Sequence, residues 1–441
     1  MTHDGLHSAT GRAAPSERRF EAGPSSESPP VRSSDRSMGV TADRLAGRSD
    51  ELAALIRAEI ESSPRRRITF ARYMDRALYE PEFGFYRSPA DRPTDAGDFL
   101  TAPETHPIFG WTVARRIEAM WQDLGRPRPF DLIEYGAGSG SLGLSVLDGF
   151  RRHGSTDLMS SIRYEPIESN PHRLDDLHRR FDQAGFADRL LERPASLNTP
   201  ASAGSSEPSG PTDSAEAVPV NGVILANEFL DALPVNRVVV RDGELRELFV
   251  AWRDERGSFA EVADEASTPE LAARLTEDGV VLAEGQTAEI CLGLGPWLDG
   301  AARRLARGYL LAIDYGYAAA ELYGPHRLAG TLLGYRGHRV EENPFAAPGE
   351  VDLTAHVDFT AVERLAAGHG FRRVAFTTQS EFLIASGLEA ELRALQASPA
   401  LTLAAYARAR SGILRMLDPR HMGRFRVLTL ARGGDRSLTR P

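Results

Sequence analysis

Short apolar runs alternate with longer amphipathic segments along most of this chain. The apolar runs, which read as strands, lie at 130–136, 162–168, 222–229, 309–316 and 372–379. Segments with apolar residues at helical spacing lie between or beside them, at 141–153, 170–185, 295–308 and 360–371. Apolar strands alternating with helices are typical of a mostly parallel sheet covered on both faces. The pattern predicts a doubly wound α/β domain over 126–441.

The rest of the chain departs from this alternation. Amphipathic helices are predicted at 50–64 and 68–79 within a helical N-terminal region, 49–125. An Asp-Gly pair at 242–243 predicts the turn of a hairpin. Residues 1–48 and about 194–219 are rich in Ser, Pro and Gly and poor in aliphatic residues. Such segments bury too little apolar surface to fold, so we predict a disordered tail and a disordered insertion.

Composition narrows the function classes. The 441 residues carry a formal net charge of -10, which disfavours a broad nucleic-acid-binding face. No apolar run approaches the roughly 20 residues that span a bilayer. All 52 basic residues are arginine, which excludes lysine Schiff bases and a P-loop. The single cysteine, Cys291, excludes internal disulfides and cysteine-rich metal sites. We expect no metal site. We also expect a cytoplasmic protein, because the acidic residues among 1–45 are unlike the composition of a transit peptide.

A glycine-rich turn follows the first apolar strand of the alternation, in "FDLIEYGAGSGSLG". Gly138, Gly140 and Gly143 match a dinucleotide fingerprint. Gly136, Gly138 and Gly140, with Glu134 ahead of them, match a loop for S-adenosylmethionine. The strand ends near Glu134, so only the second pattern uses every unusual residue of the turn. We favour the methyl donor and keep a dinucleotide as the alternative.

Acidic residues follow the next strands. Glu168 ends the second strand and is preferred over Glu165 as the ligand of ribose hydroxyls, which both cofactors require. Asn227, Glu228 and Asp231 follow the third strand, where polar groups near a buried strand need partners. Helix capping is the alternative role for Asn227 and Asp231.

Three further groups complete the candidate site. Gly97, Asp98 and Thr101 lie in one loop, "GDFLTAPE", that is expected to fold over the cofactor. His356 lies between acids and is either a tuned base or a structural histidine. Asp314 ends another strand and is expected to line the same pocket.

Several motifs in order resemble one known family, the MidA-like S-adenosylmethionine-dependent methyltransferases. They are "GDFLTAPE", "EYGAGSGSL", "ANEFLDALPV", "IDYG", "GTLLGYRGHR" and "PGEVDLTAHVDF". The resemblance implies a class I methyltransferase fold, Rossmann-like, with an N-terminal helical extension and an insertion, about 235–300, that covers the site. It also implies a protein substrate, with an arginine of a respiratory complex subunit as the methyl acceptor. Ala137, Ser139 and Tyr135 depart from the family's usual residues but keep the glycines.

We therefore expect a methyltransferase that uses S-adenosyl-L-methionine on a protein side chain, with no nucleic acid partner and no membrane span. The alternatives are an NAD(P)-binding oxidoreductase and a non-catalytic assembly factor that retains the fold. The expected catalytic residues are Asn227, Glu228, Asp231 and His356. The expected cofactor-binding residues are Gly97, Asp98, Thr101, Glu134, Gly136, Gly138, Gly140 and Glu168.

Overall fold

The structure is a computed structural model that describes residues 35–87, 101–191, 218–337, 339–399 and 401–433, with side chains from residue 47 onward. Residues 45–441 form one compact unit, and residues 1–44 are assigned to another. The insertion predicted at 194–219 and most of the predicted tail lie outside the described residues. Helix α1 (Asp35–Ser62) begins inside the predicted tail, so that helix is longer than its apolar periodicity indicated.

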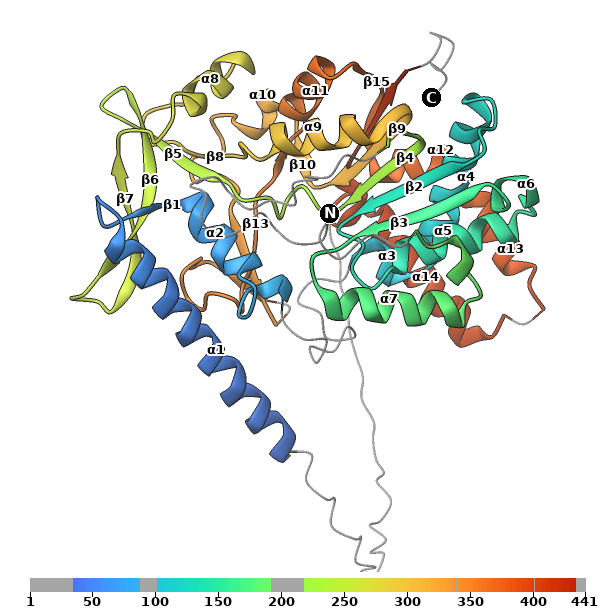
Figure 1. Cartoon of the computed structure of the whole chain (residues 1–441), viewed down its shortest axis with the longest axis horizontal. Coiled ribbons are helices and arrows are strands. Elements are labelled where there is room, and N and C mark those ends of the chain that lie inside the picture. The colour runs from blue at the N-terminus through green and yellow to red at the C-terminus, as the bar shows by residue number, and fades with distance from the viewer. Residues whose placement is uncertain (1–34, 88–100, 192–217, 338, 400, 434–441) are drawn as a thin grey trace, which may run out of the picture. The chain divides into compact units, whose positions relative to one another are not determined.

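A mixed sheet forms the centre of the α/β part (Figure 1). Its strand order in the described residues is β15 (Phe371–Thr378), β16 (Arg426–Arg432), β9 (Leu305–Asp314), β4 (Val220–Asn227), β2 (Phe130–Tyr135) and β3 (Ile162–Ile167). Strands β3, β2, β4 and β9 run parallel, whereas β16 is antiparallel to both of its neighbours. The carboxyl ends of the four parallel strands therefore meet at one edge, where open α/β sheets bind their ligands.

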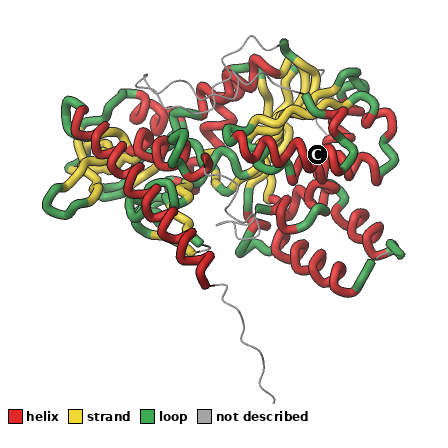
Figure 2. The backbone as a smooth tube through the Cα atoms, turned by 60° about the horizontal axis from the view of Figure 1, so that its bottom comes forward, coloured by secondary structure: helices red, strands yellow, loops and turns green. Residues whose placement is uncertain are grey.

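Helices cover both faces of this sheet, as the apolar pattern predicted (Figure 2). One face carries α4 (Ile108–Asp123), α5 (Ser141–Arg152), α6 (Thr156–Met159), α7 (Pro171–Gln183), α12 (Gln379–Ala385), α13 (Leu388–Gln396) and α14 (Leu403–Leu417). The other carries α9 (Leu294–Arg304) and α11 (Phe359–Gly368). Leu132 and Ile133 of β2 point to opposite faces and join different cores.

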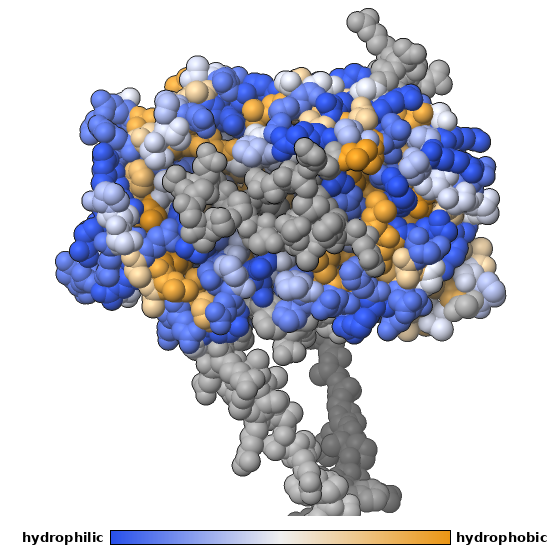
Figure 3. All heavy atoms as spheres, viewed as in Figure 1, coloured by the Kyte–Doolittle hydropathy of each residue, from blue (hydrophilic) through white to orange (hydrophobic). Residues whose placement is uncertain are grey.

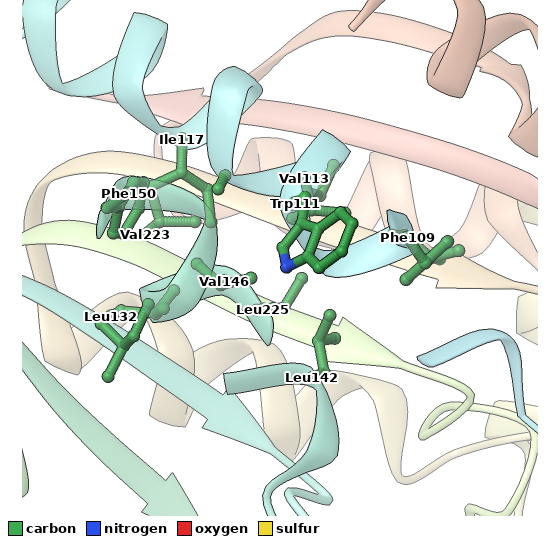
Figure 4. Packing of buried hydrophobic residues seen from close by; sticks show 14 of the residues in the cluster. Phe109, Trp111, Val113, Ile117, Leu132, Leu142, Val146, Phe150, Val223 and Leu225 are labelled. Carbon is green, nitrogen blue, oxygen red and sulfur yellow. The ribbon is translucent and has the colours of Figure 1, made fainter. Parts of the chain in front are cut away.

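The core on the α4 and α5 side is densely aromatic and aliphatic. Figure 4 shows Ile117 of α4 and Phe150 of α5 close to Val223 of β4, and Trp111 of α4 above Val146 of α5 and Leu225 of β4. Helix α4 thus belongs to the core of the main sheet. Residues on both sides of the boundary predicted at 125 share this core, because the apolar face of α4 packs against the sheet, α5, α12 and α13.

A second, antiparallel sheet is formed by strands from the segment between β4 and β9, together with one short strand from the N-terminal region. Its order is β1 (Ile68–Thr69), β6 (Glu244–Arg253), β5 (Asn236–Arg241) and β8 (Thr287–Ile290), with β7 (Ser258–Asp264) also paired to β6. It packs with α1 and α2 (Phe70–Tyr79) around Tyr73, while α8 (Glu270–Glu277) packs in a neighbouring cluster. The predicted hairpin is confirmed: Asp242 and Gly243 both have positive φ, 54° and 75°, as a type I′ turn requires.

Short elements lie near the carboxyl edge of the main sheet. They are α3 (Ala102–Thr105), β10 (Gly316–Tyr317), α10 (Ala319–Leu322), β11 (Leu333–Arg336), β12 (Arg339–Glu341), β13 (Asp352–Thr354) and β14 (Val357–Asp358). Strand β13 joins this edge because Ala355 N donates to the carbonyl oxygen of Asp231, at 3.0 Å. The helix predicted at 295–308 ends earlier, at Arg304, and β9 begins at Leu305. Leu305 and Arg307 pair with Val220 and Asn221 of β4, so this segment extends the strand instead of the helix.

The visible surface of the described residues is mostly hydrophilic, with apolar patches between charged side chains (Figure 3). None of the described helices is both long and apolar enough to cross a membrane. Within the same residues, no group of three or more His, Cys, Asp or Glu side chains has the geometry of a metal site.

Candidate functional site

The glycine loop connects β2 to α5 and needs left-handed backbone at each alternate glycine. Gly136, Gly138 and Gly140 have φ values of 67°, 53° and 77°, a region that residues with a Cβ rarely adopt. Added Cβ atoms would meet the Phe229 ring at Gly136 and Leu177 at Gly140. An added Cβ at Gly138 would lie 3.9 Å from its nearest neighbour, so the middle of the loop is open. The loop can therefore admit a ligand close to its backbone.

Gly143 has a packing role instead. A Cβ at this position would lie 2.4 Å from the Tyr164 ring. Its φ is not in the left-handed region, and it lies inside α5. The third glycine of the dinucleotide pattern is thus explained by the contact between α5 and β3, without a ligand.

Glu134 is buried on the α5 side of the sheet. Its Oε2 accepts a hydrogen bond from the Tyr164 hydroxyl at 2.7 Å, and the Gly143 backbone also donates to it. Burial raises the pKa of Glu134 to about 7, although these hydrogen bonds act in the opposite direction. Glu134 therefore anchors the start of α5 below the glycine loop.

The structure separates the two candidate acids of β3. Glu168 lies past the strand end and is 8% exposed; its Oε2 accepts from Gly138 N at 2.9 Å and its Oε1 from Asn170 N at 2.8 Å. Glu165 points the other way and forms a buried ion pair with Arg304 of α9. Only Glu168 reaches the glycine loop.

Strand β4 ends in a tight loop that carries acidic side chains. Glu228 has φ of 49°, a strained value for a residue with a Cβ. Its Oε1 accepts from Ala102 N and from Asn227 Nδ2, each at 3.3 Å. Asp314 Oδ2 accepts hydrogen bonds from three successive backbone nitrogens of the loop, residues 229–231. The end of β9 thereby fixes the loop that follows β4.

The charged forms of the Glu228 and Asp231 carboxyl groups are disfavoured. Burial and the nearby Asp231 raise the pKa of Glu228 to about 8. Burial raises the pKa of Asp231 to about 6, opposed by a hydrogen bond with the Tyr315 side chain. Two buried acceptors, Asp231 Oδ1 and Asn227 Oδ1, have no hydrogen-bond partner among the described residues. These unpaired acceptors lie beside carboxyl groups whose charged forms are disfavoured by burial. Such a site is suited to a cationic ligand with several N–H donors.

Half-buried tyrosines surround Asp231, and two of them, Tyr79 and Tyr86, were missed by the sequence analysis. Tyr79 donates to the carbonyl oxygen of Ala232 at 2.9 Å, and its ring stacks on Tyr86 with centroids 5.5 Å apart. Tyr86 donates to Asp352 Oδ1 at 2.7 Å. The negative charge of Asp231 contributes to raising the pKa of Tyr79, Tyr86 and Tyr315 alike. The sequence signal was the cluster of aromatics and acids in "YEPEFGFY", which carried no period that assigns it to a site.

The predicted cofactor-covering loop is only partly described. Gly97 and Asp98 lie outside the described residues. Thr101 precedes α3, and its backbone nitrogen donates to Glu104 Oε2 at 3.2 Å. The adjacent Ala102 bonds Glu228, so this end of the loop lies at the acidic cluster.

Tyr315 lies between His356 and Asp231. The ring of His356 contacts those of Tyr315 and Tyr317, with centroids 5.5 Å apart in each case. It lines a cavity of about 20 Å³ with Leu230, Cys291 and Asp358, room for about one water molecule. Burial and the charges of Arg327 and Arg424 lower its pKa to about 4. Tyr315, rather than His356, is the side chain that bonds Asp231.

Comparisons with known proteins agree with this geometry. Residues 112–377 match the model of a family described as "Putative S-adenosyl-L-methionine-dependent methyltransferase". A Drosophila melanogaster relative, named a mitochondrial protein arginine methyltransferase NDUFAF7 homolog, is 28% identical over 87% of this chain and 85% of its own. The zebrafish (Danio rerio) protein arginine methyltransferase NDUFAF7, also named mitochondrial, is 27% identical over 75% of this chain and 76% of its own.

Two solved structures from Burkholderia thailandensis are also similar, each 29% identical to this chain. The first is a native structure that matches with a TM-score of 0.74 over 93% of this chain and 97% of its own. The second is bound to S-adenosyl-homocysteine and matches with a TM-score of 0.73 over 92% of this chain and 96% of its own.

The names of the relatives contradict the expected cytoplasmic location, because they are mitochondrial proteins. The predicted location was wrong because it rested on a single cysteine and on acidic residues near the N-terminus, and neither property identifies a compartment.

Proposed function

This chain belongs to the family of S-adenosyl-L-methionine-dependent methyltransferases, and on that premise we propose that it methylates an arginine side chain of a protein. It is a methyltransferase with S-adenosylmethionine as its cofactor, rather than an NAD(P)-dependent oxidoreductase. Relatives named protein arginine methyltransferases support arginine as the acceptor. We also propose a respiratory complex subunit as the acceptor protein, which rests on the family resemblance.

The cofactor fits the open glycine loop. The backbone around Gly138 would approach it, and Glu168 would bind its ribose hydroxyls by exchanging the bond from Gly138 N. Glu134 would act indirectly, by fixing α5. Gly97, Asp98 and Thr101 remain predicted contacts. When bound, S-adenosylmethionine supplies a methyl group on a positively charged sulfonium.

The structural observation that supports arginine is a pair of buried oxygens, on Asp231 and Asn227 beside Glu228, that accept no hydrogen bond from the described residues. A guanidinium has five N–H donors in one plane and stays charged, so it can satisfy several acceptors at once. The stacked rings of Tyr79 and Tyr86 add a surface suited to a planar cation. This combination favours arginine over a neutral acceptor such as a hydroxyl.

The acids would serve binding, alignment and proton removal. Carboxylates at Glu228 and Asp231 would hold the guanidinium so that one nitrogen faces the methyl group, and alignment is the main source of rate in such transfers. The acceptor nitrogen would gain the methyl group as the bond from the methyl carbon to the sulfonium sulfur breaks, and it would then have to lose one proton. Glu228 would accept it, because a carboxyl whose burial raises its pKa is a better base at neutral pH than an ordinary one. No role in this step is assigned to His356.

The test is to incubate the protein with isotope-labelled S-adenosylmethionine and a mitochondrial extract, then identify methylated residues by mass spectrometry. We expect methylarginine on a small number of proteins, and its loss with Glu228→Gln. Label on lysine, on a hydroxyl or on RNA would contradict the arginine proposal. Cofactor binding without any methylated product would favour the non-catalytic assembly factor.

A further inference from the structure

We propose that Asp314 is a positioning residue for this methyltransferase: its buried carboxylate sets the conformation of the acceptor loop, residues 227–231, that presents Glu228 and Asp231. The inference rests on the proposed function, because it takes this loop as the one that binds the acceptor side chain. Asp314 itself is 0% exposed, so it touches neither cofactor nor acceptor.

The hydrogen bonds on Asp314 converge on the acceptor loop. Its Oδ2 accepts from Phe229 N at 3.2 Å, from Leu230 N at 2.9 Å and from Asp231 N at 3.3 Å. Its Oδ1 accepts from Tyr315 N at 2.9 Å. The carboxylate therefore ties the end of β9 to three consecutive residues that follow β4.

Two backbone hydrogen bonds also connect the end of β9 to the segments beside it. The carbonyl oxygen of Ile313 accepts from Glu228 N at 2.8 Å, and that of Tyr315 accepts from Val357 N at 3.0 Å. The acceptor loop is thus held from both sides of Asp314. The loop cannot rotate without losing these hydrogen bonds to a buried carboxyl group.

The loop needs such an anchor because its conformation in the fold is unfavourable by itself. Glu228 adopts φ of 49°, which is unfavourable for a residue with a Cβ. The carboxyls of Glu228 and Asp231 also repel each other, and both oppose the charge on Asp314. A buried acid at this position is costly, and the four backbone N–H groups from which it accepts hydrogen bonds offset that cost.

An acidic side chain suits this position better than its amide. Both oxygens of Asp314 accept from backbone nitrogens. Asparagine would keep one acceptor oxygen for residues 229–231 but would turn an NH2 group toward Tyr315 N, which is itself a donor. Asp314→Asn should therefore hold the loop partly, and Asp314→Ala should release it.

The experiment compares Asp314→Ala and Asp314→Asn with the wild type by backbone amide exchange and by calorimetric titration with S-adenosylmethionine. It also measures kcat and KM for S-adenosylmethionine, as transfer of label to the proteins of a mitochondrial extract. For Asp314→Ala we expect exchange of the amides of residues 229–231 to rise about tenfold or more and kcat to fall about tenfold or more. The cofactor Kd should stay within about twofold, because the glycine loop and Glu168 are held by other strands. Asp314→Asn should recover part of kcat.

Glu247→Gln is the matched control. Glu247 is also fully buried and accepts a backbone hydrogen bond, from Ser267 N, but it lies in the antiparallel sheet. It should leave the exchange of residues 229–231 and kcat unchanged.

The proposal is overturned if Asp314→Ala leaves loop exchange and kcat at wild-type values. It is also overturned if both Asp314 variants lose cofactor binding and thermal stability together, which is the pattern of a general structural role. If the alanine variant does not fold, the asparagine variant must still show faster exchange confined to residues 229–231. The exchange measurement needs no acceptor, so a wild type that methylates no arginine refutes the proposed function without deciding this inference.

Discussion

Glu168 accepts a hydrogen bond from the backbone nitrogen of Gly138, at 2.9 Å, so the end of β3 holds the middle of the glycine loop. The same carboxylate accepts from Asn170 N, which begins α7 as its N-cap. One side chain therefore sets the distance between the loop and the next helix. Both are surfaces that a nucleoside bound at this edge must contact.

We predict that Glu168→Ala weakens binding of S-adenosylmethionine by about tenfold or more, because the ribose acceptor and the bond to Gly138 are both lost. Isothermal titration calorimetry measures the Kd directly. Glu168→Gln keeps an acceptor oxygen and should bind better than the alanine variant. Equal affinity of Glu168→Ala and wild type would show that the ribose lies elsewhere.

The glycines of the loop should separate into two classes on substitution. Gly138→Ala meets open space, so we expect a loss of stability of only about 1 kcal/mol from its positive φ, but a marked loss of cofactor affinity. Gly143→Ala would force a methyl group into the Tyr164 ring and should cost about 1–3 kcal/mol of stability.

Thermal unfolding and calorimetric titration on both glycine variants give the comparison. The two-class interpretation fails if Gly143→Ala unfolds at the wild-type temperature or if Gly138→Ala binds the cofactor normally.

Glu228 should make stability depend on pH. Burial raises its pKa from the ordinary value of 4.5 to about 8, so the folded chain binds this proton more tightly than the unfolded chain. Its contribution is complete below about pH 4.5 and is lost as the pH rises through about 8. We expect the free energy of unfolding to fall over this interval, and Glu228→Gln to flatten the fall by about 1–3 kcal/mol.

Urea denaturation at several pH values measures this effect. Asp231 and Glu134 also have raised pKa values, so a residual slope should remain in the variant. In the wild type, kcat/KM should rise with pH toward about 8 as Glu228 ionises. An unchanged slope in Glu228→Gln would contradict the assignment of this proton to Glu228.

The buried ion pair between Glu165 and Arg304 should matter for stability and not for the cofactor. Removing one partner leaves an uncompensated charge, so Glu165→Gln should cost about 3–5 kcal/mol, with an unchanged Kd for S-adenosylmethionine. The double variant Glu165→Leu, Arg304→Met should recover much of that loss. Chemical denaturation of the single and double variants measures this, and a weaker cofactor affinity in Glu165→Gln would return Glu165 to the binding site.

Most strands of the main sheet were predictable because they are continuous apolar runs, and the helices that alternate with them because their apolar residues recur at helical spacing. Leu132 and Ile133 lie in an apolar run that ends at the glycine turn, and acids mark the ends of the next strands. Glu168 was preferred over Glu165 for that reason, and the structure brings only Glu168 to the loop.

The partners of the acids were not predictable in the same way. Asp314 reaches residues 229–231 only because β4 and β9 are neighbours in register, with Asn227 opposite Ile313. Tyr79 and Tyr86 come from a helix and a short turn far away in the chain. No local pattern records such pairings, since they arise when the two sheets and their helices pack.

Strand β16 lies between β9 and β15 although it follows both in the chain. Until residues 426–432 have been synthesised, β9 and β15 each expose an edge with unpaired backbone groups. The sheet therefore cannot form strand by strand during synthesis, because the inner strand β16 is synthesised after the outer strand β15. We expect nascent chains that stop before Arg426 to depend on chaperones and to aggregate through those two edges.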